Sequence, residues 1–204
     1  MGDKTYIIGL AGLARSGKDT VASLLLQERF FFPFVTTSFA LPMKEMIYAG
    51  LGLKDKEDDK ALKLYGRSYR HIAQTLGTEW GRKCIHPDLW LKIAEHRCKG
   101  LNTIITDVRF ENEAEFVRAN GILVHIDRHD QKYIEESFHE SESGIAVKHG
   151  DFKILNHGTL DDLRVTCRHA AIDLEEMLKH KEKWEGGTCN VPSTSTDDDD
   201  DLPF

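Results

Sequence analysis

A chain of 204 residues suits one catalytic domain around a single core, and its 40% hydrophobic and 30% charged residues are typical of a soluble globular protein. No apolar run approaches the roughly 20 residues that span a bilayer, and no signal peptide precedes the first apolar run, so we expect a cytoplasmic protein without a membrane helix. The formal net charge of −7 includes five consecutive aspartates, Asp197–Asp201, which leaves −2 for the rest, and basic residues are interspersed with acids, so direct nucleic-acid binding is not expected.

Two strand-and-helix units open the chain. An apolar run over residues 6–10 predicts a buried strand, and after a glycine-bearing loop the helical spacing of apolar residues from Val21 to Leu25 predicts a helix. A second apolar run over residues 35–39 predicts another strand. A helix-like stretch over residues 43–48 follows, and Pro42 suits its first turn because that turn leaves backbone N–H groups unpaired.

The middle of the chain is mainly helical in composition. Residues 54–60 form a charged connector, and residues 61–85 predict several short helices in place of one long helix. The predicted breaks are the glycines Gly66, Gly77 and Gly81. His86-Pro87-Asp88 then resembles a helix start, with a helix to about Lys99.

Strands and helices alternate in the second half. The expected strands cover residues 103–106, 122–126 and 152–155, and the expected helices cover residues 112–119 and 160–183. This alternation implies an α/β fold in three layers, with a mostly parallel sheet between helices, in one domain over residues 1–185. The tail over residues 186–204 is rich in Gly, Ser, Thr, Pro and Asp and is expected to be disordered.

A predicted phosphate-binding loop joins the first strand to the first helix. Its sequence is Gly12-Leu13-Ala14-Arg15-Ser16-Gly17-Lys18-Asp19-Thr20. Glycines let backbone N–H groups turn toward phosphate oxygens, the helix N-terminus adds partial positive charge, and Lys18 reaches the β and γ phosphates of ATP. The predicted ATP-binding residues are Gly12, Ala14, Arg15, Ser16, Gly17, Lys18, Asp19 and Thr20. The alternative is a strand-to-helix turn that binds no ligand.

One position departs from the usual loop. Most such loops place Ser or Thr directly after the lysine to bind Mg²⁺, whereas this chain has Asp19 there and Thr20 one residue later. Asp19 can approach Mg²⁺ through water, and the Thr20 hydroxyl can meet a phosphate. Nucleoside monophosphate kinases share this displaced threonine.

A second anchor follows the strand over residues 103–106. Asp107 lies at the carboxyl end of an expected parallel strand, where ligands bind in open α/β sheets, and is the best candidate to hold Mg²⁺ or its waters. Arg109 lies two residues on, on the same side of an extended chain, and can grip a transferring phosphoryl group or an acceptor phosphate. The predicted metal ligands are therefore Asp19, Thr20 and Asp107. The alternative is a surface ion pair between Asp107 and Arg109.

The stretch between these two motifs resembles the bacteriophage-type deoxynucleoside monophosphate kinases. The matching segments are Tyr65-Gly66-Arg67-Ser68-Tyr69-Arg70, Gln74, Gly77-Thr78-Glu79-Trp80-Gly81-Arg82, Pro87-Asp88-Leu89-Trp90, Ser38-Phe39-Ala40, Pro42-Met43-Lys44, the run Asp107–Glu113, and His139-Glu140-Ser141-Glu142. The resemblance spans about Gly9 to Leu163. It implies a P-loop kinase fold of the nucleoside monophosphate kinase type that transfers the γ-phosphoryl group of ATP to a deoxynucleotide with Mg²⁺, in nucleotide supply for DNA synthesis.

The resemblance also implies a helical acceptor-binding region over about residues 54–99. The predicted acceptor-binding residues are Arg67, Arg70, Gln74, Thr78, Glu79, Arg82 and Arg109. An acceptor that is already an anion needs fixed arginines, and the forked donors of Arg70, Arg82 and Arg109 suit it. Gln74 can donate to and accept from a base edge. Trp80 or Tyr69 either stacks on the base or belongs to the core.

Residues 128–150 would form a helical lid that closes over the phosphates and excludes water, with Arg128 at its base. Together with the two motifs, this gives the predicted catalytic residues Lys18, Arg15, Asp107, Arg109 and Arg128. By the same resemblance, Asn156 and Gly158 flank the adenine end of the ATP site, His139 and Glu142 match the family pattern, and a homodimer is possible.

Two other classes of function stay open. An animal-type phosphomevalonate kinase has a similar G-K-D loop and a comparable Asp-x-Arg strand end, and a dephospho-coenzyme A kinase is a more distant rival. A non-catalytic module that holds ATP without an acceptor is the second class. The accepted base and the preference for ribose or deoxyribose are left undecided by the sequence.

Overall fold

The computed structural model describes residues 5–28, 30, 33–53, 63–64, 66–128 and 144–184. The charged connector over 54–60, most of the expected lid, including His139 and Glu142, and the expected disordered tail lie outside the described residues. In the part that is described, no helix is both long and apolar enough to cross a membrane.

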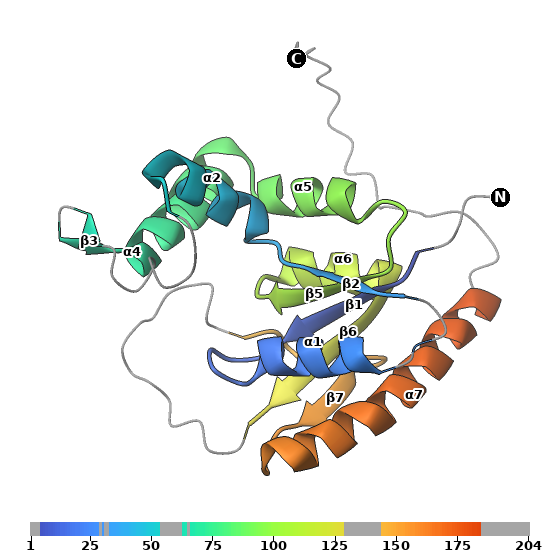
Figure 1. Cartoon of the computed structure of the whole chain (residues 1–204). Helices are drawn as coiled ribbons and strands as arrows, with labels where there is room; N and C mark the ends of the chain where they lie inside the picture. The colour runs from blue at the N-terminus through green and yellow to red at the C-terminus, as the bar shows by residue number, and fades with distance from the viewer. Residues whose placement is uncertain are drawn as a thin grey trace.

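A five-stranded parallel sheet forms the centre of the fold (Figure 1). Its strands are β1 (Ile7–Ala11), β2 (Val35–Thr37), β5 (Thr103–Val108), β6 (Gly121–Asp127) and β7 (Phe152–Leu155). They lie in the order β2-β5-β1-β6-β7. β1 is central. The connection from β1 runs to β2 at one edge of the sheet, whereas the later connections from β5 to β6 and from β6 to β7 run toward the other edge. The direction therefore reverses at the carboxyl end of β1, which is where open α/β sheets bind ligands.

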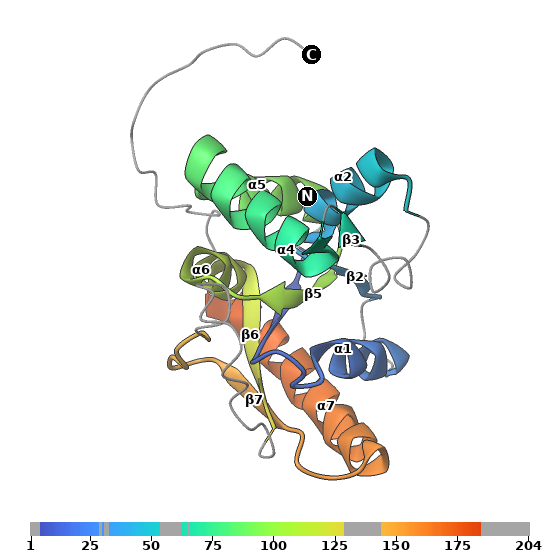
Figure 2. The same ribbon diagram turned by 90° about the vertical axis from the view of Figure 1, so that its left-hand side faces the viewer.

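Helices cover both faces of the sheet, as the turned view in Figure 2 also shows. On one face, α1 (Lys18–Gln27) and α7 (Leu160–Trp184) bury Leu24 and Leu174 against Ile8 and Ile104. On the other face, α5 (Leu89–Cys98) and α6 (Glu111–Asn120) pack on the strands through residues such as Val117. This arrangement confirms the predicted three-layer α/β fold with a mostly parallel sheet.

The predicted helix breaks at Gly77 and Gly81 are wrong. The α-helix α4 (Tyr69–Gln74) runs without interruption into the π-helix η1 (Thr75–Ile85), which contains both glycines. A Cβ on Gly81 would lie 2.5 Å from the Trp90 indole, and one on Gly77 would lie 2.8 Å from Met43 Sδ of α2 (Leu41–Leu51). These glycines allow close helix packing, so tertiary contact and not chain bending accounts for them.

Gly66 does interrupt the helical region, but in a turn that the sequence analysis did not predict. It lies between the antiparallel strands β3 (Lys63–Leu64) and β4 (Arg67–Ser68), with φ of +80°. Glycine adopts that left-handed conformation readily because it has no Cβ atom. The acceptor-side helices therefore start after a short hairpin.

Replacing Gly81 with Ala is expected to lower the free energy of unfolding by about 1 to 3 kcal/mol, the usual cost of overpacking. The physical reason is the 2.5 Å approach of the added Cβ to the Trp90 ring. Gly50→Ala in α2 is the matched control, because a Cβ there meets nothing within 4 Å, and it should stabilise the helix by about 0.5 to 1 kcal/mol. Urea unfolding measures the free energy of unfolding of both variants. Equal changes of the same sign in the two variants would contradict the packing argument.

Candidate active site

The predicted phosphate-binding loop connects β1 to α1. Gly12 and Gly17 have φ of +153° and +97°, and Arg15 between them also has a positive φ, of +64°. Such left-handed backbone turns successive N–H groups to one side and makes an anion-binding concavity. α1 starts directly at Lys18, so the partial positive charge of its N-terminus faces the same place.

Lys18 lies across this loop. Its Nζ donates hydrogen bonds to the carbonyl oxygens of Gly12, at 2.7 Å, and Leu13, at 2.8 Å. Asp19 and Thr20 follow in the first turn of α1 and are exposed. The loop thus presents an ammonium, a carboxylate and a hydroxyl next to its backbone N–H groups.

Asn156, which follows β7, supports the loop from behind. Its side-chain amide donates to the carbonyl oxygen of Ser16 at 2.9 Å. A Cβ on Gly17 would lie 2.6 Å from the same amide nitrogen, so glycine is needed at that position for space as well as for its positive φ. The side-chain amide of Asn156 thus contacts the loop backbone.

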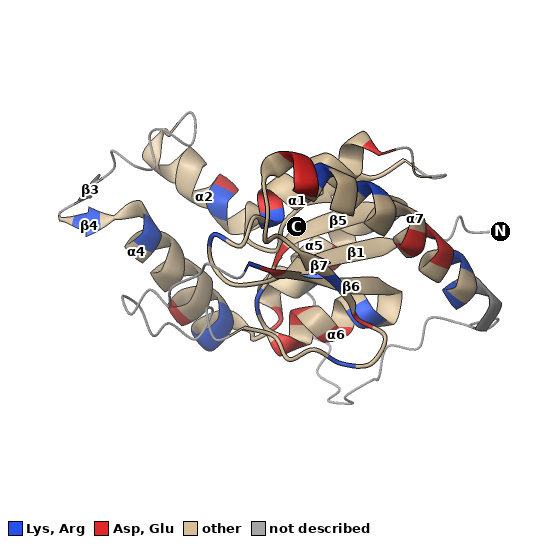
Figure 3. Cartoon of the chain, turned by 90° about the horizontal axis from the view of Figure 1, so that it is seen from below, with Lys and Arg blue, Asp and Glu red and all other residues tan. Residues whose placement is uncertain are grey.

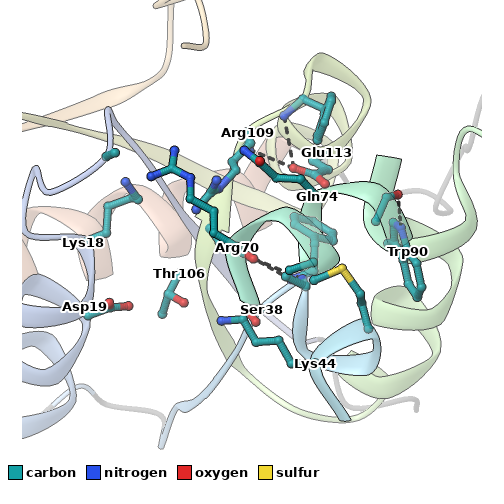
Figure 4. A pocket seen from close by; sticks show the side chains of 18 of the residues that line it. Lys18, Asp19, Ser38, Lys44, Arg70, Gln74, Trp90, Thr106, Arg109 and Glu113 are labelled. Carbon is teal, nitrogen blue, oxygen red and sulfur yellow. Dashed lines mark hydrogen bonds between the residues drawn. The ribbon is translucent and has the colours of Figure 1, made fainter. Parts of the chain in front are cut away.

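A cavity of about 640 Å³ lies over the loop and extends to α4 and η1. Figure 4 shows Lys18 and Asp19 on one side, Gln74 and Trp90 on the other, and Arg70 and Arg109 between them. The predicted site residues that line the cavity are Ala14, Arg15, Gly17, Lys18, Asp19, Thr20, Arg70, Gln74, Thr78, Arg82, Asp107, Arg109 and Arg128. The structure thus gathers most of the predicted residues, from both halves of the fold, around one space.

Four predicted residues do not line the cavity. Gly12 and Ser16 lie in the loop, and Ser16 is buried. Arg67 is exposed on β4, and Glu79 is exposed on η1, where it pairs with Lys83 at 3.0 Å. The assignment of Arg67 and Glu79 to the acceptor site has no geometric support in the described residues.

The cavity wall also contains residues to which the sequence analysis gave no role. They are Ser38, Phe39, Ala40, Met43, Lys44, Ala73, Gly77, Trp90, Thr106, Phe110 and Glu113. Tyr69, for which the sequence left stacking on the base or a place in the core open, also lines the cavity. Phe39, Met43 and Trp90 are buried and make this end of the cavity apolar. Such a surface suits a planar ring, with polar groups such as Gln74 and Thr78 at its edge.

Asp107 joins the end of β5 to the start of α2. Its carboxylate accepts hydrogen bonds from the backbone N–H groups of Phe39, at 2.7 Å, and Ala40, at 3.1 Å. Burial raises the pKa of Asp107 above its ordinary value, while these N–H groups and the charges of Arg109 and Lys44 act in the opposite direction. The carboxylate is an oxygen ligand in the cavity wall as well as a structural tie.

Glu113, in the first turn of α6, is another carboxylate of this wall and is buried. It accepts from the side chain of Arg82 and from the backbone N–H groups of Arg109, at 2.8 Å, and Phe110, at 3.1 Å. Burial, with the nearby charge of Asp107, raises the pKa of Glu113 to about 7, although Arg82 opposes this. A carboxylate with a shifted pKa and hydrogen bonds to both of its oxygens is a common feature of functional sites.

The oxygen ligands of the cavity fit a magnesium ion. Mg²⁺ in kinases is bound through one or two carboxylates together with substrate phosphates and water, and needs no cage of protein ligands. Asp19, Thr20 and Asp107 all line the cavity. Across the described ranges no cluster of three or more His, Cys, Asp or Glu suited to a metal occurs.

Comparisons with known proteins single out one family. Residues 66–167 match the family model described as deoxynucleotide monophosphate kinase. The deoxynucleoside-5'-monophosphate kinase of Escherichia phage T5 is 37% identical over 98 residues, which cover 44% of this chain and 39% of the phage protein. A putative deoxynucleotide monophosphate kinase of Acanthamoeba polyphaga mimivirus is 29% identical over 183 residues, which cover 76% of this chain and 91% of the viral protein.

Among solved structures, a gluconokinase from Sinorhizobium meliloti 1021 is similar with a TM-score of 0.45 and 12% sequence identity. The match covers 89% of this chain and 99% of the gluconokinase. This likeness is too weak to support an argument about function.

Proposed function

The chain belongs to the deoxynucleotide monophosphate kinase family, and from this premise we propose that it transfers the γ-phosphoryl group of ATP to a deoxynucleoside monophosphate. The products are ADP and a deoxynucleoside diphosphate. The reaction would take place in the cytoplasm and supply nucleotides for DNA synthesis. The chain spans about two fifths of the phage relative, so the activity of that whole protein comes to this chain only as part of the proposal.

One observation carries the proposal: a single cavity joins a phosphate-binding loop to a second set of arginines. Lys18 and the loop N–H groups lie on the α1 side, and Arg70 and Arg82 line the α4 and η1 side. A kinase that joins two anions needs positive charge on both sides of the transferred group. A module that only stores ATP has no need of the second set.

The proposed mechanism is in-line transfer without a covalent intermediate. Lys18, Arg15 and the loop N–H groups stabilise the charge that develops on the γ-phosphoryl group. Arg70 and Arg109 hold the acceptor phosphate in line with it, and Arg128 supplies further positive charge at the cavity edge. Positioning and electrostatics then account for the rate.

Asp19, Thr20 and Asp107 would hold Mg²⁺. When bound, the ion would neutralise part of the phosphate charge and orient the phosphates of ATP. The hydrogen bonds from Phe39 and Ala40 fix the Asp107 carboxylate, so its orientation does not depend on the ligand.

The proposed base site is the apolar end of the cavity. Phe39 and Met43 supply buried surface, and Gln74 and Thr78 supply polar groups at its edge. A site built to hydrogen-bond a base edge can reject a mismatched base far more strongly than an apolar pocket can. We therefore expect a measurable preference for one base over the others.

ADP release coupled to a reporter enzyme tests the proposal with dAMP, dGMP, dCMP and dTMP, the four matching ribonucleotides, phosphomevalonate and dephospho-coenzyme A. We expect release above the no-acceptor level with at least one deoxynucleotide, dependent on added Mg²⁺. Selective release with phosphomevalonate or dephospho-coenzyme A would replace the proposed acceptor. Release that stays at the no-acceptor level with every compound would instead favour the non-catalytic module.

A further inference from the structure

Glu113 lies where the two sides of the cavity meet. It belongs to α6, is only 2% exposed, and uses both carboxylate oxygens. Oε1 accepts from Arg82 of η1, and Oε2 accepts from the backbone N–H groups of Arg109 and Phe110, which follow β5. One side chain thus connects the acceptor-side helix to the end of the central strand.

The Arg82 guanidinium is fixed by three contacts. Besides Glu113, it donates to the carbonyl oxygen of Pro87 at 2.9 Å, and it stacks over the Phe110 ring at 3.8 Å from the ring centroid. A guanidinium has five N–H donors in a planar fork, so these two hydrogen bonds leave donors for an anion in the cavity that Arg82 lines. Its plane is set before any ligand arrives.

The same carboxylate fixes the backbone from which the Arg109 side chain extends. Its backbone N–H donates to Glu113 Oε2, whereas its exposed side chain lines the cavity. Because the hydrogen bond sets the backbone after β5, it sets the direction in which the Arg109 side chain leaves the chain. Two arginines from different elements therefore take their positions from one carboxylate.

The location of this carboxylate is electrostatically unfavourable. Burial and the charge of nearby Asp107 both act against ionisation of Glu113. A neutral side chain of similar size would hold the helix to the strand without that penalty, since buried ion pairs are often replaceable by apolar packing at little cost in stability. What an apolar residue could not do is orient a guanidinium.

We propose that Glu113 is a positioning residue for the acceptor phosphate, acting through Arg82 and Arg109. This inference rests on the proposed function, because it assigns a role within the same site. It does not make Glu113 a group that touches substrate. It predicts that loss of the carboxylate disturbs the acceptor selectively and leaves ATP binding at the loop unchanged.

Glu113→Gln is the first test. Glutamine keeps the size and one acceptor oxygen for the two backbone N–H groups, but turns an NH₂ group toward Arg82, which has only donors. In steady-state kinetics we expect KM for the deoxynucleotide to rise about tenfold and KM for ATP to change less than about twofold. Glu45→Gln is the matched control. It removes an exposed ion pair, in which Arg97 of α5 lies 2.6 Å from Glu45 of α2, and Glu45 lines no part of the cavity.

A double-mutant cycle separates positioning from simple stabilisation. Because Glu113 is proposed to act through Arg82 as well as Arg109, Glu113→Gln should raise the acceptor KM clearly less in an Arg82→Ala background, where the Arg82 part is already lost, than in the wild type. Equal effects in both backgrounds, or equal rises in KM for ATP and acceptor, would overturn the proposal. If Glu113→Gln does not fold, Arg82→Lys keeps the charge and loses the fork, and an unchanged acceptor KM in that variant would also overturn it.

The wild type in the same assay distinguishes this inference from the proposed function. An active wild type with no selective effect of Glu113→Gln refutes the positioning role alone. If no deoxynucleotide is phosphorylated, calorimetric binding of the same deoxynucleotides decides: weaker binding by Glu113→Gln supports the role at a binding site, and equal binding overturns it. A wild type that neither phosphorylates nor binds any of them overturns both.

Discussion

Replacing Lys18 with Ala is expected to lower kcat by about 10²-fold or more, the scale on which preorganised electrostatic donors contribute to catalysis. Lys18 is the ammonium of the loop, held over it by hydrogen bonds to Gly12 and Leu13. In the proposed mechanism it meets charge that grows on the γ-phosphoryl group in the transition state, so its loss should reduce kcat more than it raises KM for ATP. Coupled ADP release at saturating ATP and deoxynucleotide measures the change.

Lys92→Ala is the control for this variant. Lys92 is exposed on α5 and does not line the cavity, so the same loss of charge there should leave kcat within about twofold. Circular dichroism and thermal unfolding of both variants show whether the fold is kept. A Lys18→Ala enzyme with near wild-type turnover would refute the assigned role of the loop.

The loop and the sheet were predictable because their signals are local. The loop is one continuous stretch of nine residues, and its glycines do what their positions require, with positive φ at Gly12 and Gly17. The strands are short apolar runs that alternate with helical spacing, and the structure confirms a parallel sheet in three layers. Neither inference needed knowledge of which distant residues meet.

The glycines of η1 show where local reasoning failed. Gly77 and Gly81 look like breaks because glycine disfavours helix, yet their cause is the close approach of Met43 and Trp90. Trp90 also donates from its indole N–H to the Gly77 carbonyl at 2.7 Å, which satisfies a backbone acceptor of the π-helix. No pattern within residues 61–85 contains that partner.

The register of the acceptor-side helix contained a signal that the sequence analysis did not use. The residues that line the cavity, Arg70, Gln74, Thr78 and Arg82, recur every four positions, and therefore share one face of a continuous helical segment. Arg67 and Glu79 are off this register, and the structure places both outside the cavity wall. The assumed breaks concealed the periodicity.

Glu113 was not assigned a role because its environment is set by distant residues. In sequence it is one of several acids at the start of a helix, a pattern typical of a solvated first turn. Its main partner, Arg82, lies 31 residues earlier on another helix. The available hint was its place three residues after Phe110, since a Glu there can accept from the backbone N–H that precedes a helix, as it does here.

Arg70→Ala is expected to raise KM for the deoxynucleotide about ten- to hundredfold while KM for ATP changes little. Arg70 projects from α4 into the cavity between the loop side and the Gln74 side (Figure 4). A charge-assisted hydrogen bond to the acceptor phosphate is worth about 1.5 to 3 kcal/mol, and each 1.4 kcal/mol corresponds to a factor of ten. Initial rates over a grid of ATP and deoxynucleotide concentrations give both constants.

Arg97→Ala provides the matched comparison, since Arg97 is an exposed arginine of α5 that pairs with Glu45 and lines no part of the cavity. Charges of both signs are interspersed along the helices in Figure 3, so removing one arginine changes the general field only slightly. A selective effect of Arg70→Ala therefore reports a contact and not a loss of net charge. If both variants raise the acceptor KM alike, or Arg70→Ala weakens ATP and acceptor equally, the acceptor phosphate does not bind at Arg70, and the cavity side formed by α4 and η1 must have another role.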